Sequence, residues 1–331
     1  MNRRLRGLQR QAWLLRPLRA ARNLTRFKIP LHLERRFRHL APSATEELKT
    51  RLLEFRQAPS DRPQEDEDLH NHLFRRLAEN RRQIVPWLDA AKPLEGTTIL
   101  EIGCGTGSAT VALAEQGARL TAIDVDPRSI AVAEERCRLH GVQATFLVAN
   151  AARLDEVLSA ERFDFIIFFA SLEHMTHAER LAAMSHTWKM LPSGGLWCVV
   201  ETPNRLWYYD HHTAHLDFFM WLSDELAADY IRFSPREDVR DQIERADDRQ
   251  HALCRAGRGV SFHEFDLTLG KASELQIVSS MPLFYRRRDP ALRLLWRLSD
   301  DYRFERFLAR RCPQIHAAFL QPSLDIIVRK P

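Results

Sequence analysis

The sequence predicts an α/β fold: a doubly wound, seven-stranded, mostly parallel sheet with an N-terminal helical extension and two insertions. From residue 97 onward, short apolar runs alternate with amphipathic stretches, which is typical of strand–helix units in a parallel sheet. The first apolar run is followed by three glycines spaced two apart, Gly103, Gly105 and Gly107. A chain of 331 residues is long enough for one such domain and an appendage.

The expected elements follow in chain order. Apolar runs predict strands at 97–102, 119–123, 144–148, 163–169 and 195–201, with helices near 107–116, 127–139 and 177–190. A helix over 263–273, a strand over 275–283 and a last strand in SLDIIVRK (323–330) complete the seven-stranded sheet.

Residues 1–90 are expected to form a basic helical extension. Residues 1–40 carry twelve Arg and Lys against one acid, Glu34, so this segment is strongly basic and the rest of the chain is mildly acidic. Leu5, Leu8, Ala12 and Leu15 fall at helical spacing. Such a helix can lie on an anionic membrane surface, contact nucleic-acid phosphates, or pack on the body or a second subunit. A mitochondrial transit peptide is also possible, and the sequence leaves all four open.

The rest of the extension and the two insertions have distinct compositions. Polar residues with prolines predict a linker over 57–67, and apolar residues at helical spacing predict a helix over 68–92. The insertion over 205–258 is rich in His, Asp, Arg and aromatic residues, and we expect it to form a substrate lid. Its aromatic residues either stack on the substrate or anchor the lid: Trp207, Tyr208, Tyr209, Phe218, Phe219 and Trp221. The second insertion, 286–322, is arginine-rich and expected to be helical.

Composition excludes several classes of protein. No apolar run approaches the roughly 20 residues that span a bilayer, and no apolar segment near the start resembles a secretory signal. Five scattered cysteines show no metal-binding spacing and are expected to be reduced thiols. We therefore expect a cytoplasmic protein, with a peripheral position at the inner membrane face left open by the basic segment.

The glycine-rich turn predicts the nature of its ligand. In an open α/β sheet, ligands bind beyond the carboxyl ends of the strands, near the first strand–helix turn. The spacing GxGxG differs from the dinucleotide fingerprint GxGxxG, and the Lys-Ser/Thr pair of a phosphate-binding loop is missing. Glu101 would repel a phosphate but suits an ammonium group, so the ligand is expected to be cationic or zwitterionic.

The stretch LEIGCGTG (100–107) resembles the first motif of class I S-adenosylmethionine-dependent methyltransferases. Later pieces agree with that family in order and spacing: LTAIDVDP (120–127), FLVANAARL (146–154), FDFIIFFASLEHM (163–175) and LPSGGLWCVVETPNR (191–205). The resemblance covers residues 95–204 and, more weakly, 260–331. It implies a methyltransferase domain over 91–331 with a Rossmann-like fold and S-adenosyl-L-methionine as cofactor.

The resemblance also implies roles for individual residues. Gly103, Gly105 and Gly107 would pass under the methionine and ribose of the cofactor, and Glu101 would help to hold its amino group. Asp124 would accept hydrogen bonds from the ribose hydroxyls, and Asn150 and Ala151 would lie at the adenine. Two points stay open: Asp124 could cap a helix while Asp126 binds the ribose, and Asn150 could be only a loop residue.

Methyl transfer to a hydroxyl or ammonium requires a group that removes a proton, and histidine suits this task near neutral pH. Glu173 and His174 follow the fourth expected strand, and His211, His212 and His215 follow the fifth. Both sets flank the same cleft of the predicted sheet. The predicted catalytic residues are therefore Glu173, His174, His212 and His215.

The Glu-His pair resembles two metal-assisted branches of the family, the quinone-ring O-methyltransferases and the small-RNA 3′-end 2′-O-methyltransferases. The resemblance implies a divalent metal held by Glu173, His174 and His215. Those branches commonly carry another Glu three residues before the pair, where this sequence has Ala170. A histidine base without metal is therefore favoured over a metal, and a structural or substrate-contacting role for these histidines is the third possibility.

The sequence favours O-methylation of a saccharide, a lipid-linked acceptor or a small metabolite, because the lid resembles loops of bacterial methyltransferases with cell-surface substrates. RNA 2′-O-methylation competes with it, although no RNA-binding module is present. N-methylation of a small molecule, a non-catalytic cofactor-binding subunit and a dinucleotide oxidoreductase also stay open. The sequence predicts no oligomeric state.

Overall fold

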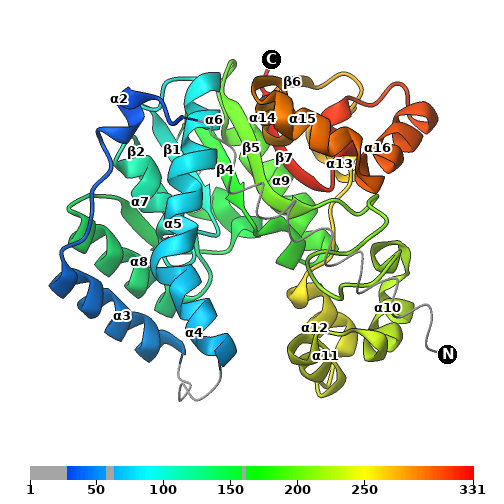
Figure 1. Cartoon of the computed structure of the whole chain (residues 1–331), viewed down its shortest axis with the longest axis horizontal. Coiled ribbons are helices and arrows are strands. Elements are labelled where there is room, and N and C mark those ends of the chain that lie inside the picture. Colours follow the sequence, from blue (N-terminus) through cyan, green and yellow to red (C-terminus); the bar gives the residue numbers. More distant parts are fainter. Residues whose placement is uncertain (1–27, 57–62, 159–161) are drawn as a thin grey trace.

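A computed structural model describes residues 28–56, 63–158 and 162–331, and this part of the chain contains a seven-stranded sheet covered by helices on both faces (Figure 1). The strand order is β3-β2-β1-β4-β5-β7-β6, in which β7 runs antiparallel to both neighbours and the other pairs are parallel. The predicted α/β class is confirmed. The strands are β1 Thr98–Ile102, β2 Arg119–Asp124, β3 Thr145–Val148, β4 Phe165–Phe169, β5 Leu196–Pro203, β6 Gln276–Ser280 and β7 Ser323–Arg329.

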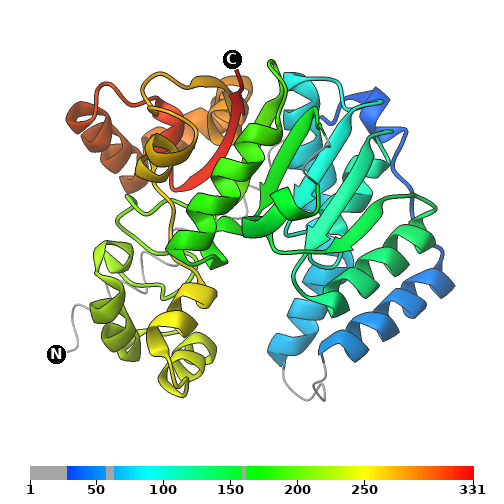
Figure 2. The same cartoon turned by 180° about the vertical axis from the view of Figure 1, so that it is seen from behind.

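The two faces of the sheet bury different hydrophobic clusters. Leu100, Ile102 and Phe168 face α9 (His177–Met190) and α13 (Phe262–Thr268). Ile99 and Ile167 face the opposite layer, which includes α6 (Val85–Ala91) and α7 (Ser108–Ala114). Because both faces are covered, the central strand β4 is apolar along its whole length rather than alternating. Helix α8 (Pro127–His140) completes the layer that contains α7 (Figure 2).

The helical extension is described from residue 28 onward. Its elements are α2 Leu31–Glu34, α3 Pro42–Arg56, α4 Pro63–His70, the π-helical turn η1 Asn71–Arg75, α5 Arg76–Glu79 and the π-helical turn η2 Asn80–Ile84, which leads into α6. The predicted apolar face is confirmed, since Leu69, Leu73, Leu77 and Ile84 are all buried. The extension also docks on the domain by an ion pair between Arg81 and the fully buried Glu115 of the loop after α7.

Two expectations for the extension have different outcomes. The amphipathic pattern of Leu5, Leu8, Ala12 and Leu15 lies outside the described residues. The predicted linker over 57–67 lies partly outside them too, but its end is wrong, because α4 already begins at Pro63. Proline is favourable in the first turn of a helix, where its missing N–H has no partner to lose.

The insertions are helical. The first contains η5 Phe219–Trp221, α10 Asp224–Tyr230, η6 Ile231–Phe233, α11 Glu237–Glu244 and α12 Arg249–Ala256, which share a small hydrophobic core. Its helices lie on the opposite side of the molecule from α3 and α4 (Figures 1 and 2). The second contains α14 Met281–Arg288, α15 Pro290–Arg297, α16 Asp300–Arg311 and η7 Ala317–Leu320.

Two predicted boundaries near the second insertion are wrong. The expected strand over 275–283 ends at Ser280, because Pro282 lies in the first turn of α14. The expected helix over 263–273 ends at Thr268. Within the described residues, no helix is long and apolar enough to cross a membrane.

Candidate active site

The turn between β1 and α7 needs glycine for two separate reasons. Gly103, Gly105 and Gly107 all have positive φ, at 77°, 50° and 80°. A Cβ on Gly103 would lie 2.7 Å from Ser171 Cβ, and one on Gly107 would lie 2.9 Å from the backbone of Ala133. A Cβ on Gly105 would meet nothing within 4 Å, so its backbone borders open space. A ligand can therefore approach the backbone at Gly105, while the other two glycines pack against β4 and α8.

Glu101 lies directly before this turn and is fully buried. Neither of its carboxylate oxygens has a hydrogen-bond partner among the described residues. Burial raises the pKa of Glu101 to about 8, against the opposing effect of the Thr110 hydroxyl. A buried carboxylate without a partner is costly, and a ligand ammonium group would remove that cost. The site therefore fits the amino group of an amino-acid-like ligand.

Asp124 ends β2 and turns its carboxylate toward the glycine turn. Its Oδ2 accepts a hydrogen bond from the Gly105 N–H at 2.9 Å, and its Oδ1 accepts one from the Asp126 N–H at 3.0 Å. Asp126 is the residue that caps α8, because its side chain accepts from the Arg128 N–H and pairs with the Arg128 guanidinium. The possibility that Asp124 caps the helix is therefore wrong. Binding of a ribose by Asp124 stays a prediction.

Asn150 and Ala151 follow β3, the strand next to β2. Asn150 is exposed and its Oδ1 accepts a hydrogen bond from the Ala152 N–H, so it caps η3 (Ala151–Glu156). Ala151 is buried. Their predicted contact with an adenine stays a prediction.

Three predicted catalytic side chains meet at the carboxyl ends of β4 and β5. The potential ligand atoms of Glu173, His174 and His212 all lie within 4.8 Å of one another. Glu173 is fully buried, and its Oε2 accepts a hydrogen bond from the Thr202 hydroxyl at 3.0 Å. Its Oε1 lies 3.9 Å from His212 Nε2, and the two imidazole rings lie 5.2 Å apart. We call these three residues the Glu-His-His cluster.

Hydrogen bonds around the cluster determine which nitrogen of each histidine carries the proton. His174 Nδ1 lies 2.8 Å from the Arg255 carbonyl oxygen, which can only accept, so this nitrogen donates. The Thr213 hydroxyl donates to the Gly257 carbonyl at 2.7 Å and therefore accepts from His212 Nδ1 at 3.1 Å. In neutral imidazoles, both Nε2 atoms are then left with lone pairs.

Burial keeps these imidazoles neutral. It lowers the pKa of His212 to about 4, and it also holds the pKa of His174 below its usual range. Burial raises the pKa of Glu173 to about 8, against the opposing hydrogen bonds it accepts. Two neutral imidazoles and a buried carboxyl group therefore lie together in the cluster.

The cluster lies beside the glycine turn. Ser171 lies two residues before Glu173; its Cβ borders Gly103, and its hydroxyl donates to the Ile102 carbonyl at 3.3 Å. Ala170, directly before it, has a positive φ of 39°, which bends the chain away from β4. The residues that would bind a ligand at the turn and the residues that could act on it thus share one edge of the sheet.

Part of this chain is similar to known proteins. The family described as "Methyltransferase domain" matches residues 99–195. The ubiquinone biosynthesis O-methyltransferase of Xylella fastidiosa is 40% identical over 117 residues, covering 34% of this chain and 44% of that protein. Its counterpart from Cereibacter sphaeroides is 35% identical over 120 residues, covering 36% and 46%. The chain thus spans less than half the length of these relatives.

Residues 99–195 of the protein thus match a methyltransferase domain. Among solved structures, magnesium protoporphyrin IX methyltransferase from Synechocystis PCC 6803 is 20% identical, with 52% of this chain and 83% of that chain covered and a TM-score of 0.37.

The Glu-His-His cluster fits a divalent metal. Two imidazole nitrogens and one carboxylate make a ligand set that zinc, iron and other transition metals accept, with positions left over for a substrate. The set differs from the one expected from the sequence, because His212 rather than His215 joins Glu173 and His174. Asp210 fixes this choice by accepting hydrogen bonds from the backbone N–H groups of His212, Thr213 and Ala214.

His215 lies outside the cluster. Its φ is 53°, and its Nε2 lies 3.1 Å from the carbonyl oxygen of His211. Of the four catalytic residues predicted from the sequence, the structure brings together three.

Sequence reasoning missed the residues that hold the Glu-His-His cluster in place. The Arg255 and Gly257 carbonyls orient the two imidazoles, and the Arg258 N–H donates to the Glu173 carbonyl at 2.8 Å. A Cβ on Gly257 would lie 2.6 Å from the His212 ring, so only glycine leaves room there. Because backbone carbonyls orient the two imidazoles, the identity of the side chains at these positions could not have predicted this role.

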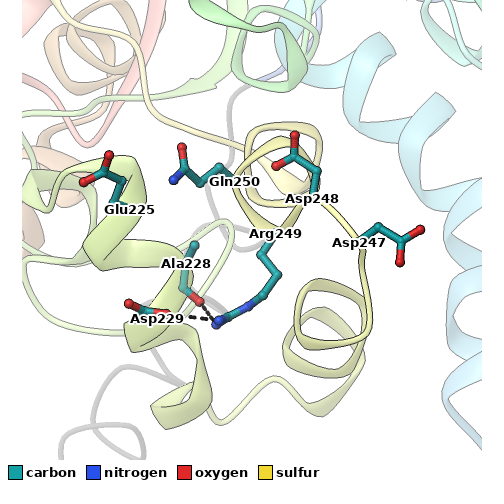
Figure 3. A pocket seen from close by; sticks show the side chains of 7 residues that line it. All are labelled: Glu225, Ala228, Asp229, Asp247, Asp248, Arg249 and Gln250. Carbon is teal, nitrogen blue, oxygen red and sulfur yellow. Dashed lines mark hydrogen bonds and ion pairs between the residues drawn. The ribbon is translucent and has the colours of Figure 1, made fainter.

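A pocket of about 490 Å³ lies elsewhere on the first insertion, between α10 and α12 (Figure 3). Carboxylates dominate its lining, from Glu225, Asp229, Asp247 and Asp248, and its Arg249 is engaged by Asp229 and the Ala228 carbonyl. None of the predicted site residues lines it, so the chemistry is expected at the cluster and not in this pocket.

Proposed function

We propose that this protein transfers the methyl group of S-adenosylmethionine to a hydroxyl of a small metabolite, with a divalent metal held by Glu173, His174 and His212. The observation that carries the proposal is that ligand atoms of two neutral histidines and a buried carboxyl group lie within 4.8 Å of one another, beside the glycine turn. The relatives from Xylella and Cereibacter are named O-methyltransferases, which supports oxygen as the methylated atom.

The cofactor would supply an electrophilic methyl group on its sulfonium. Glu101 suits its ammonium group, because the carboxylate is buried and without a partner among the described residues. Asp124 suits the ribose hydroxyls, since a carboxylate accepts hydrogen bonds and this one already reaches the Gly105 N–H. The open backbone at Gly105 leaves room for the body of the ligand.

The acceptor hydroxyl must lose a proton, and the cluster offers two ways to assist. A histidine whose pKa is about 4 is deprotonated at neutral pH but is a weak base. The same neutral imidazole is a good metal ligand. A divalent metal in the cluster would lower the pKa of a bound hydroxyl. The geometry therefore supports metal assistance over the metal-free histidine base that the sequence favoured.

The acceptor is expected to have an apolar ring. In the loop after β5, Trp207 and Phe219 are buried anchors, but Phe218 and Trp221 are 48% and 51% exposed. The Phe218 and Trp221 rings pack edge to face at 4.8 Å, and Tyr208 lies beside Phe218. Exposed rings of this kind stack on aromatic and other apolar groups. This favours a phenolic or similar small-molecule hydroxyl over a saccharide or RNA.

A transfer assay tests the proposal. The purified protein is incubated with methyl-labelled S-adenosylmethionine and fractionated extract, and label is sorted into small-molecule, lipid, glycan, RNA and protein pools. We expect alkali-stable label in the small-molecule or lipid pool, its loss on chelation, and its return with a divalent cation. Label confined to RNA or glycan would contradict the acceptor class. S-adenosylhomocysteine binding with no label in any pool would favour a non-catalytic subunit.

A further inference from the structure

The second insertion presents a surface that the proposed methyl transfer does not use. Helices α14, α15 and α16 follow β6 and lie together at one end of the sheet (Figure 1). Their exposed charges are almost all positive: Arg287, Arg288, Arg293, Arg297, Arg303, Arg306, Arg310 and Arg311. Asp300, paired with Arg303, is the one exposed acid of residues 281–311. We call residues 281–311 the arginine-rich surface.

Large apolar side chains are exposed among these arginines. Leu294 is 59% exposed, Leu298 is 74% exposed and Phe307 is 47% exposed. Leu294 and Leu298 are four residues apart and so lie on one face at the end of α15. No residue of α15 is fully buried. Single exposed leucines are ordinary. Two exposed leucines on one face of a helix, surrounded by exposed arginines, indicate a surface that binds a partner.

We propose that the arginine-rich surface docks on an anionic lipid bilayer. The leucines and Phe307 would enter the headgroup region, and the arginines would pair with lipid phosphates. Nucleic acid would engage the arginines but gives the leucines nothing to bury against, so a bilayer accounts for both features.

The docking surface is joined to the candidate active site. Asp301, in the first turn of α16, accepts hydrogen bonds from Trp207 Nε1 at 3.3 Å and from the Tyr208 hydroxyl at 3.1 Å. Phe304 packs edge to face on the Trp207 ring at 5.1 Å. The loop anchored in this way continues to His212 of the cluster. If the proposed function holds, docking brings the acceptor loop to the bilayer, which suits an acceptor that resides in lipid.

Vesicle flotation of the full chain tests the docking. The probes are vesicles of phosphatidylcholine alone and vesicles that also contain about 30% phosphatidylglycerol, a typical anionic surface. We expect binding to the anionic vesicles only. The double substitution Leu294→Gln/Leu298→Gln should weaken that binding about tenfold or more, because two apolar side chains lose their insertion. The matched control is Leu226→Gln/Leu267→Gln, which removes two exposed leucines outside this surface.

Three results would overturn the docking. The first is that wild type and the Leu294/Leu298 variant bind the anionic vesicles equally well. The second is that the control variant weakens vesicle binding as much as the Leu294/Leu298 variant does. The third is that Arg293→Gln/Arg297→Gln weakens the capture of duplex DNA but leaves vesicle binding unchanged. The basic residues 1–40 are the same in every variant, so a difference between variants reports on this surface alone. Folding of each variant is checked by its melting temperature.

The two proposals fail separately. Methyl transfer to a water-soluble acceptor should continue at the wild-type rate in the Leu294/Leu298 variant. Wild-type protein that binds vesicles but transfers no methyl group would leave the docking supported and overturn the proposed function.

Discussion

The cofactor turn and the Glu-His-His cluster lie on the same edge of the sheet but are built in different ways. The turn draws on residues 101–107 and Asp124, which are close in sequence, and backbone sterics fix it through positive φ at three glycines. The cluster joins residues 173–174 with His212 and is braced by carbonyls at 255 and 257. The geometry of the turn is thus set by a short motif, while that of the cluster depends on backbone groups that are distant in sequence. Substitutions confined to one region show whether the two are separable.

The largest effect is expected at the cluster. Glu173→Gln keeps the shape of the side chain but removes the carboxyl group that a divalent metal would bind together with the two imidazoles. Turnover should fall about 10³-fold while the affinity for S-adenosylhomocysteine stays within about threefold. Single-turnover methyl transfer and titration calorimetry measure the two quantities.

The matched control is Glu264→Gln, a buried glutamate that pairs with Arg180 outside the cluster. It should lower the melting temperature but leave turnover intact. A parallel loss of turnover and cofactor affinity in Glu173→Gln would show that the two regions do not act separately.

The next largest effect is a loss of stability on substitution in the glycine turn. Gly107→Ala places a Cβ 2.9 Å from Ala133 at a φ of 80°, so α7 or α8 must shift. We expect a loss of about 3 kcal/mol in the free energy of unfolding, from overpacking added to backbone strain. Gly96→Ala has a similar φ of 73° with open space, and should cost about 1 kcal/mol from strain alone. Denaturant unfolding compares them, and equal losses would contradict the packing argument.

A smaller effect is the difference in cofactor affinity expected between substitutions of Asp124 and Asp126. Asp124→Asn should weaken cofactor binding about tenfold or more, because an amide cannot accept two hydrogen bonds from hydroxyls as well as a carboxylate can. Asp126→Asn should leave binding within about twofold, since asparagine caps a helix as well as aspartate does. Calorimetry with S-adenosylhomocysteine measures both. The reverse order would return the ribose role to Asp126.

The last effect is a dependence of stability on pH. The pKa of Glu101 is raised to about 8 in the folded protein from an ordinary value of 4.5. The folded state therefore binds more protons than the unfolded state between these values, and this residue makes the cofactor-free protein lose stability as pH rises from 4.5 to 8. Glu101→Gln should remove that component, so its stability relative to wild type should increase across this window. Melting temperatures at several pH values measure it, and a constant difference would contradict the burial argument.

Sequence predicted most of the sheet because short apolar runs and the glycine turn depend on neighbouring residues. Strand β6 ended early because Pro282 starts a helix within an apolar run. The position of Asp124 at the end of the second strand was predicted, and the fold brings it to the Gly105 N–H. The choice between His212 and His215 was not predictable, because it depends on the hydrogen bonds of Asp210 and on room made by Gly257. Both histidines have the same side chain, and only the tertiary fold distinguishes them.

The most direct test of the cluster compares His212→Gln with His215→Gln. Each variant is assayed for turnover, for S-adenosylhomocysteine affinity and for binding of a divalent cation by titration calorimetry. We predict that His212→Gln loses turnover by about 10²-fold or more together with cation binding, while His215→Gln stays within about threefold of wild type in all three measurements. Loss of turnover in His215→Gln with full activity in His212→Gln would contradict the assignment of the cluster.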